Sequence, residues 1–459
     1  MKHARRSRFS ESDTVRFPRH ASPQIHTVCK GSLTLTRCWQ DRPQAPFSRR
    51  ERGFLVSVSS VDRPGRREHE RHQLDRIHRW PLRIDDPDRR RRREFILVDP
   101  TSWLPSTDNA AVAETASTLG MDLQLELSRC QVETNSPVCQ SIGELRTHLI
   151  DMRRRAAKAA ELNGCRLLAV GAPLSGPSRF EISDAPRYRQ MGERFGALAA
   201  EQSICGCHIH VGVADRAEAV QVCNHVRIWL PALLALSANS RVHQGSDTEF
   251  ASWRAIQWSR WPVAGPPPYF ESAADFDTVV ARMVDCGVML DERMAYWDVR
   301  PSCHLPTVEI RVCDVQPTAD DAALLATLGR ALVATALRAI DRGIEAPNIS
   351  LENLRLATWV SAKEGVLGTS IDPVTTQRIS ATELLRRLLI HVRDSLDETG
   401  EYASVESALR NKSVTGSGSD WQQRTLRQVC LRELIARAVQ RTTPIEPARM
   451  DTHAGPAPD

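Results

Sequence analysis

Hydrophobic and polar positions from residue 94 onward alternate between strand-like and helix-like patterns. Residues 94–100 (EFILVDP) are typical of a strand that runs into a turn, and residues 123–135 predict a further extended segment. Residues 141–164 carry apolar side chains at helical spacing, begin with Ser and Glu at capping-box spacing and end in Gly, which predicts a long amphipathic helix. Residues 165–173 (CRLLAVGAP) then predict a buried strand.

The centre of the chain continues this alternation. Residues 205–213 and 307–315 predict strands, residues 320–340 a helix, and residues 217–239 a helix interrupted near Pro231. The longest largely apolar stretch, residues 228–238, has eleven residues. A membrane helix needs about 20, so we expect no membrane-spanning segment. A length of 459 residues with this mixture predicts two or three ordinary domains, or one large α/β or α+β domain.

Charge divides the chain into two unlike parts. Residues 1–93 contain 22 Arg and two Lys against eleven acidic residues, a net charge of +13, whereas the remaining residues have a net charge of −8. The first part shows almost no sustained apolar periodicity, which predicts a disordered basic arm. A nucleic-acid-binding tail is the alternative. It is disfavoured because residues 1–93 contain no recognisable nucleic-acid-reading module and no interleaved aromatic residues, so we do not expect a nucleic-acid partner.

The twelve cysteines follow no regular spacing, and several lie inside apolar runs. This usage is typical of reduced, intracellular proteins, in which free Cys behaves as a small hydrophobic residue. The basic N-terminal residues are not followed by an apolar region, so a secretory signal is not expected. These patterns predict a cytoplasmic protein.

His208 and His210 lie two residues apart in a predicted strand, so both imidazoles project from one face and can reach one ligand or metal ion. A pair of structural or surface histidines would give the same pattern. The nearby Cys205 and Cys207 allow a structural zinc site as a further alternative, but no second Cys or His pair occurs at finger-like spacing.

Acidic residues occur on several of the predicted strands. Glu309 and Arg311 share one strand face, where a carboxylate would suit a hard cation and a guanidinium a phosphoryl group; a cross-strand salt bridge is the alternative. Glu94, Glu126 and Glu133 lie in largely apolar segments. Because buried carboxylates are costly unless they are paired or bound to metal, these three are candidate ligands.

Residues 251–270 (ASWRAIQWSRWPVAGPPPYF) combine three Trp, two Arg and four Pro without a clear period. We interpret them as an ordered binding loop in which Arg254 and Arg260 contact a carboxylate or phosphate. A packed Ω-type loop is the alternative. The sequence contains no GxxxxGK[ST] loop, no GxGxxG motif after a strand and no GxSxG motif, so a P-loop or Rossmann nucleotide site is not supported.

Several ordered segments together resemble one enzyme family. CHIHVGV, LSANS, ASWRAIQWSRWPVAGPP, YWDVRP and TVEIRVCD, followed by VTGSGSDWQQR, are similar to motifs of the ATP-dependent carboxylate-amine ligases, the group labelled glutamate-cysteine ligase type 2. The resemblance extends from about Glu94 to about Ala438 and does not include residues 1–93.

This resemblance implies an α+β fold like the catalytic domain of glutamine synthetase, with a curved, mainly antiparallel sheet flanked by helices. The concave face of such a sheet holds ATP and divalent ions, Mg²⁺ or Mn²⁺. The implied reaction joins L-glutamate to L-cysteine through an acyl phosphate, so the expected partners are amino acids and ATP. The resemblance also suggests a homodimer.

Matching motifs carry the family's roles over to individual residues. The resemblance implies that Glu309 and Arg311 are catalytic, with Arg311 stabilising the transferred phosphate, and that His210, Arg254 and Arg260 contact nucleotide or substrate. The implied metal ligands are Glu94, Glu126, Glu133, His208 and Glu309. We predict that Glu309→Ala and Arg311→Ala abolish turnover while leaving the fold largely intact.

The chain departs from the family at its first strand. The family opens with Gly-Val-Glu-Glu-Glu-Phe, in which the first and third glutamates face the metals, whereas this chain has four arginines before Glu94 and Phe95. Arg92 therefore stands where a metal ligand is expected, which should weaken metal binding and catalysis. If codons for Gly-Val-Glu-Glu are read one base early and one base is lost, they encode four arginines. Residues 1–93 are therefore either a disordered segment or a segment translated out of the ancestral reading frame.

These expectations divide the chain into residues 1–93, a catalytic domain at residues 94–440 and a disordered tail at residues 441–459. A weakly active ligase is the favoured function. The alternatives are a catalytically silent relative, retained for nucleotide binding or as a decayed gene product, and a metal-dependent hydrolase that uses the two histidines.

Overall fold

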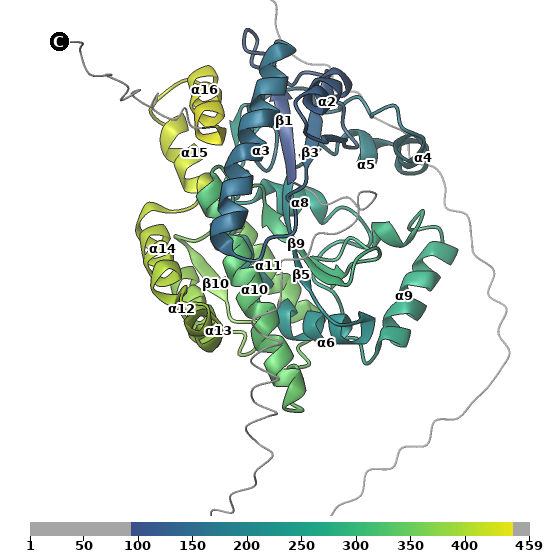
Figure 1. Ribbon diagram of the computed structural model, residues 1–459, viewed down its shortest axis with the longest axis vertical. Helices are drawn as coiled ribbons and strands as arrows, with labels where there is room; N and C mark the ends of the chain where they lie inside the picture. The colour runs from purple at the N-terminus through teal and green to yellow at the C-terminus, as the bar shows by residue number, and fades with distance from the viewer. Residues whose placement is uncertain (1–92, 444–459) are drawn as a thin grey trace, which may run out of the picture. The chain divides into compact units, whose positions relative to one another are not determined.

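A computed structural model describes residues 93–443, in which one antiparallel sheet lies among helices (Figure 1). Seven strands of the described part build this sheet in the order β2-β3-β1-β5-β9-β8, with β4 also paired to β1. The predicted α+β class and mainly antiparallel sheet are confirmed. The strands are β1 (Arg93–Val98), β2 (Gln124–Leu125), β3 (Gln131–Thr134), β4 (Arg166–Leu168), β5 (Gly206–Gly212), β8 (Val299–Pro301) and β9 (Thr307–Asp314).

Helices make up most of the remaining structure. Two small hairpins accompany them, β6 (Val242–His243) with β7 (Ser246–Asp247) and β10 (Thr369–Ile371) with β11 (Arg378–Ser380). The helices are α2 (Asn109–Thr118), α3 (Ile142–Leu162), α4 (Pro186–Phe195), α5 (Ala197–Ala200), α6 (Arg216–Val226), η1 (Arg227–Trp229), α7 (Leu230–Ser237), α8 (Trp253–Trp258), α9 (Ala273–Asp285), η2 (Glu292–Met294), α10 (Ala319–Asp341), α11 (Leu351–Glu364), α12 (Ala381–His391), α13 (Arg393–Glu398), α14 (Tyr402–Thr415), α15 (Gly418–Leu426) and α16 (Leu431–Thr442). Figure 1 shows α12, α13 and α14 grouped on one side of the molecule and α9 on the other.

The strongest local signals of the sequence give the expected elements. The long helix α3 begins where the capping pattern predicts, because the Ser141 side chain accepts a hydrogen bond from the Glu144 backbone amide. Helix α10 is capped in the same way by Thr318, which accepts from the Asp321 amide. The strands predicted around residues 94–100, 165–173, 205–213 and 307–315 are all present.

Helix α10 covers the apolar face of the central strands. It comes closest at Gly329, where an added Cβ would lie only 3.1 Å from Ile209 and 3.3 Å from Ile310. Since side chains alternate along a strand, burying Ile209 and Ile310 under α10 turns His210 and Glu309 to the opposite face. The packing of α10 therefore determines which side of the sheet carries the polar residues.

Two expectations about elements were wrong in detail. Residues 123–135 form a hairpin of β2 and β3 rather than one extended segment, so Glu126 lies just after a strand. The interruption predicted near Pro231 is confirmed: it occurs at η1, and Pro231 lies in the first turn of α7, where its missing amide donor is harmless. The loop predicted at residues 251–270 contains the helix α8.

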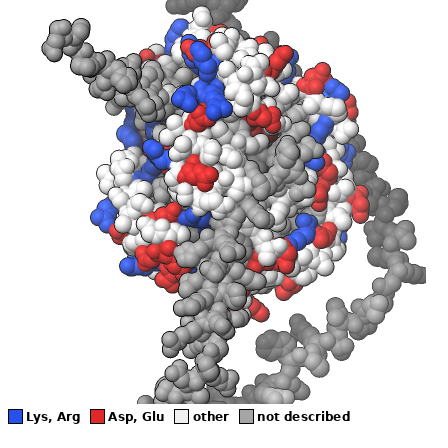
Figure 2. All heavy atoms as spheres, viewed as in Figure 1, with Lys and Arg blue, Asp and Glu red and all other residues white. Residues whose placement is uncertain are grey.

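Two described helical stretches, Arg216–Ser237 and Ala319–Asp341, are long and apolar enough to cross a membrane by composition alone. In both, most of the apolar window is buried inside the protein, 78% and 67% respectively, as is usual for core helices. Figure 2 shows basic and acidic side chains spread over one face of the molecule. The predictions for residues 1–92 and 444–459 lie outside the described residues, and α16 continues to Thr442, two residues past the predicted domain end.

Candidate active site

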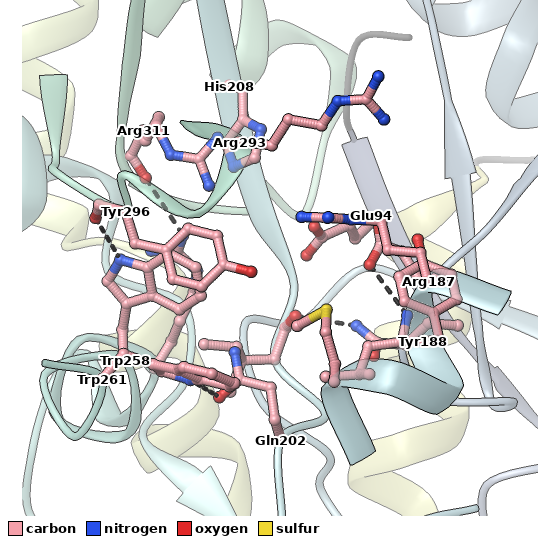
Figure 3. A pocket seen from close by; sticks show the side chains of 16 residues that line it. Glu94, Arg187, Tyr188, Gln202, His208, Trp258, Trp261, Arg293, Tyr296 and Arg311 are labelled. Atoms are coloured by element: carbon pink, nitrogen blue, oxygen red, sulfur yellow. Dashed lines mark hydrogen bonds between the residues drawn. The ribbon is translucent and has the colours of Figure 1, made fainter. Parts of the chain in front are cut away.

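A pocket lies on the polar face of the sheet, bounded by β1, β5, β9 and the loops around them (Figure 3). We call it the sheet-face pocket; about 620 Å³ of its space is not filled by protein atoms, and this volume includes open solvent. Its lining includes five of the predicted site residues, which are Glu94, Glu126, His208, Arg254 and Arg311. Figure 3 shows Glu94, Arg187 and Tyr188 on one side, facing Arg311, Tyr296 and Trp258 on the other.

Three buried glutamates form the acidic side of this region. Glu94 on β1 and Glu133 on β3 are directly opposite in the strand register, and Glu126 follows β2. They are 9%, 2% and 6% exposed, respectively. The Gly206 amide donates to Glu94 Oε2 at 2.9 Å, which ties β5 to this acidic side. A cation, from a side chain or a metal ion, offsets the repulsion between carboxylates that lie opposite each other on buried strands.

Glu309 is the centre of the opposite, basic side. Its Oε2 accepts from Arg300 Nε at 2.7 Å, and its Oε1 accepts from Arg311 Nη1. His208 Nδ1 and His210 Nε2 lie 3.5 Å and 3.8 Å from Glu309 Oε1. Burial alone would raise the pKa of Glu309, but the charges of the two arginines and the two histidines outweigh it and hold the pKa well below its usual value. Glu309 is therefore an ionised anchor for two guanidinium groups.

Arg254 is fixed beneath the pocket by backbone groups. It is 3% exposed, and its guanidinium donates to the carbonyls of Arg311 and Val312 at 3.1 and 3.2 Å. A Cβ at Gly206 would lie 2.6 Å from Arg254 Nη2, so a larger residue on β5 would displace this guanidinium. Trp258, one turn further along α8, packs its ring 5.9 Å from the Arg254 guanidinium.

Comparison with known proteins identifies the family. The model of glutamate-cysteine ligase family 2 matches residues 93–442. The chain belongs to this family. It is 50% identical over 331 residues to "Putative glutamate--cysteine ligase 2-1" of Nocardia farcinica, covering 72% of this chain and 86% of that protein. It is 48% identical over 332 residues to "Putative glutamate--cysteine ligase 2-3" of Mycolicibacterium smegmatis, covering 72% and 91%.

Solved structures agree on the fold. The crystal structure of glutamate–cysteine ligase from Francisella tularensis in complex with AMP superposes with a TM-score of 0.56 at 14% identity, covering 78% of this chain and 89% of that one. A bifunctional glutathione synthetase from Pasteurella multocida gives a TM-score of 0.58 at 12% identity, covering 82% of this chain and 54% of that one. This member of glutamate-cysteine ligase family 2 therefore has the fold of those ligases.

Four predicted site residues of this family member do not line the sheet-face pocket: Glu133, His210, Arg260 and Glu309. Glu133 lies opposite Glu94 in the strand register, and Glu309 accepts a hydrogen bond from Arg311, so both lie next to residues that line the pocket. The His210 ring forms a hydrogen bond with the Thr307 hydroxyl at 3.0 Å. Arg260 lies apart: it is exposed and forms an ion pair with Glu201 at 2.7 Å. Arg260 is thus absent from the lining of the sheet-face pocket, although it lines a second cavity together with Arg254.

The donor chemistry of the acidic side fits a hard divalent ion. Glu94, Glu126 and Glu133 offer carboxylate oxygens, which Mg²⁺ and Mn²⁺ prefer, and His208 offers an imidazole. In the described part of the chain, the group of potential metal-ligand atoms that lie within 4.8 Å of one another belongs to Cys139, Glu144 and His148. None of these three residues lines the sheet-face pocket. The glutamates would therefore have to rotate to converge on one ion.

The zinc alternative at Cys205 and Cys207 gains no support. Both residues are buried, at 0% and 1% exposure. Burial raises the pKa of Cys205 well above its usual value, so its thiol stays protonated, whereas a zinc ligand must be a thiolate. The ten described cysteines are free thiols.

The sequence analysis missed several residues in the pocket wall and beside it. Arg300 carries the second guanidinium bound to Glu309, although its motif YWDVRP contributed to the family resemblance. Trp258 and Trp261 lay in a segment already singled out. No periodic signal could have placed the others, because their segments reach the pocket only through tertiary folding; these are Arg187, Tyr188, Gln202 and Arg293.

Proposed function

We propose that this protein is an ATP-dependent carboxylate–amine ligase that joins the γ-carboxylate of L-glutamate to the amino group of L-cysteine. The observation that carries the proposal is the meeting of Glu94, Glu126, His208 and Arg311, from distant parts of the chain, in one pocket. Membership of glutamate-cysteine ligase family 2 supports the same activity.

The reaction has two steps. A γ-carboxylate oxygen of glutamate attacks the γ-phosphorus of ATP, giving γ-glutamyl phosphate and ADP. The amine nitrogen then attacks the acyl carbon, the carbon–oxygen bond to phosphate breaks, and the amine loses a proton to solvent. Both steps place negative charge near the transferred phosphoryl group, so cationic groups fixed in advance lower the barrier.

The residues of the pocket suit this chemistry. Arg311 faces the phosphoryl group, and Glu309 holds Arg300 and Arg311 in position so that no reorganisation is needed during the reaction. The rings of Trp258 and Tyr296 pack against the Arg311 guanidinium at 5.7 and 5.9 Å and exclude water from it. Glu94, Glu126, Glu133 and His208, with Glu309 beside them, would hold Mg²⁺ or Mn²⁺. When bound, the ion neutralises phosphate charge.

Turnover by the purified chain tests the proposal. We expect ADP release that requires L-glutamate, L-cysteine and Mg²⁺ or Mn²⁺ together, and γ-glutamylcysteine detected by mass spectrometry. Nucleotide binding without ADP release would instead support the silent relative. We favour the ligase because the arginines and the Glu309 anchor are all in place. Hydrolysis of ATP without either amino acid would favour the hydrolase.

The unusual first strand gives a sharper test. We propose that the residues preceding β1, which begins at Arg93, form a segment separate from the catalytic domain, and that the cation of Arg92, next to β1 in the sequence, weakens metal binding there. Arg92→Glu should therefore raise the rate of ADP release at least tenfold and lower the Mg²⁺ concentration required, because it restores a carboxylate at this point of the family pattern. Arg89→Glu makes the same charge change outside that pattern and should have little effect. An equal response to both changes would contradict the proposed role of Arg92.

Further features of the proposal concern the setting of the enzyme. We propose a cytoplasmic protein whose partners are ATP and amino acids. A homodimer remains a prediction, and sedimentation of the purified chain would test it.

A further inference from the structure

A second cavity adjoins the sheet-face pocket. It lies between α8, the following loop and α11, and we call it the α8–α11 cavity; about 1060 Å³ of its space is not filled by protein atoms, and this volume includes open solvent. Arg254, Trp258 and Trp261 line both spaces, so a single layer of side chains separates them. The cavity also reaches solvent, because Arg355 and Trp359 on its lining are exposed.

The inner wall of the α8–α11 cavity carries a buried carboxylate, Asp298. This residue is 4% exposed. Its backbone is fixed on both sides, since its amide donates to the Gly265 carbonyl at 2.8 Å and its carbonyl accepts from the Arg311 amide at 2.7 Å. Among the described residues, none donates a hydrogen bond to the Asp298 carboxylate, which therefore faces the cavity as an acceptor site.

The ionisation of Asp298 agrees with this geometry. Burial raises its pKa to about 6, although the charges of Arg254 and Arg311 act in the opposite direction. The carboxylate is thus ionised at neutral pH in a poorly solvated place. A cationic group arriving in the cavity would relieve this cost.

Groups of the opposite character lie on α11. Arg355 is exposed, and Trp359 on the same helix is 53% exposed. The Thr358 hydroxyl between them is buried without a hydrogen-bond partner among the described residues. The cavity therefore offers one carboxylate on its inner wall and a guanidinium with a hydroxyl on its α11 wall. Its lining also includes Arg254, which is bound to backbone carbonyls, and Arg260, which is paired with Glu201. This combination suits a zwitterion, which has one ammonium and one carboxylate.

We propose that the α8–α11 cavity binds the amine substrate as a zwitterionic amino acid, with its ammonium at Asp298 and its carboxylate at Arg355. The inference rests on the proposed ligase function and assigns one of its two amino acids to this cavity.

The position of Asp298 decides which amino acid this is. Its backbone pairs with Arg311, the residue that faces the phosphoryl group, so the ammonium end of the ligand lies next to the reacting centre. In the acceptor, the nitrogen is the reacting atom, and its ammonium first gives one proton to the Asp298 carboxylate so that a neutral amine attacks. In the donor, the reacting atom is a γ-carboxylate oxygen, which Asp298 would repel. The cavity therefore fits the acceptor, which enters on the side of Trp258 and Trp261 away from the sheet-face pocket.

Hydroxylamine separates the two substrate sites experimentally. It is a small neutral amine at pH 7.5 that captures γ-glutamyl phosphate as a hydroxamate without ammonium recognition. For Asp298→Asn, we expect the KM for L-cysteine to rise at least tenfold, while the KM for L-glutamate in the hydroxamate assay stays within twofold. Asp285→Asn, an exposed site on α9, is the matched control and should change neither value.

A second variant addresses the other end of the ligand. Arg355→Ala should raise the KM for L-cysteine several-fold but leave the KM for cysteamine, which lacks the carboxylate, unchanged. Arg282→Ala, exposed on α9, is its control. A rise in the KM for L-glutamate in either site variant would assign the cavity to the donor and overturn the proposal, as would equal losses with cysteine and hydroxylamine. If the unaltered protein forms no hydroxamate from L-glutamate and ATP, the ligase function itself fails.

Discussion

Glu309 lies between two buried guanidinium groups and is itself 3% exposed. Glu309→Ala would leave Arg300 and Arg311 buried without their counter-charge, and breaking such a pair costs about 3–5 kcal/mol. We therefore revise the expectation that this variant keeps its fold largely intact. Urea unfolding should show the loss. Glu201→Ala, which breaks the exposed pair with Arg260, is the control and should cost no more than about 1 kcal/mol. Equal losses would contradict the anchor role of Glu309.

Asp298 makes a prediction about pH. Its pKa is about 6 in the folded protein, above the usual aspartate value of 3.8 that applies to the unfolded chain, so the folded state binds the proton more tightly. The stability that this proton confers is present below pH 4 and is lost as the pH rises to about 6. Asp298→Asn removes the titration. At pH 7.5 the variant should be more stable than the unaltered protein by about 3 kcal/mol, with little difference at pH 4. Urea unfolding at both pH values tests this, and a variant that is less stable at pH 7.5 would contradict it.

At the scale of elements, the short helix α8 places Arg254 and Trp258 in the lining of both the sheet-face pocket and the α8–α11 cavity. Its N-cap is Ser252, whose hydroxyl accepts from the Ala255 amide at 3.2 Å and donates to Asp314 at 2.8 Å. Asp314 also accepts from the Ser240 hydroxyl at 2.7 Å, so three segments of the chain meet at one buried carboxylate. The position of α8 depends on this junction more than on its own six residues.

Ser252→Ala should therefore affect both stability and activity. Loss of the cap and of a hydrogen bond to a charged group should cost about 2–4 kcal/mol. The KM values for both amino acids should rise, because Arg254 and Trp258 lie on the helix that Ser252 caps. Ser272→Ala removes the exposed N-cap of α9 and should cost only about 1 kcal/mol without changing either KM. An unchanged KM in Ser252→Ala would show that α8 holds its position by other contacts.

The same elements show what the sequence could predict. Strands β1, β5 and β9 and helix α3 have strong local patterns, so the opposite faces of His208 and Ile209 could be inferred from spacing. The β2–β3 hairpin was missed because residues 126–130 contain neither Gly nor Pro to mark the turn. The junction at Asp314 could not be predicted, since Ser240 lies 74 residues away and only tertiary packing brings it there.

At the scale of the whole molecule, Arg153 on α3 joins distant segments. It is 4% exposed and donates to the carbonyls of Gln316, Pro317 and Thr442 at 2.7, 2.8 and 3.3 Å. Arg153→Met should destabilise the protein by about 3 kcal/mol, because it leaves buried carbonyls without donors. Arg154→Met, at a largely exposed neighbour paired only with Asp151, should cost less than about 0.5 kcal/mol. Similar midpoints of urea unfolding for the two variants would contradict this role.

The hydroxyl of Thr442 accepts a hydrogen bond from the amide of Ala169, 273 residues earlier in the chain. During translation at about 5–20 residues per second, roughly 15 to 55 seconds pass between the synthesis of these two residues. Throughout this interval the nascent polypeptide has an incomplete interior beside β4. Productive folding in the cell should therefore depend on chaperones that shield the growing chain until the ribosome has delivered α16.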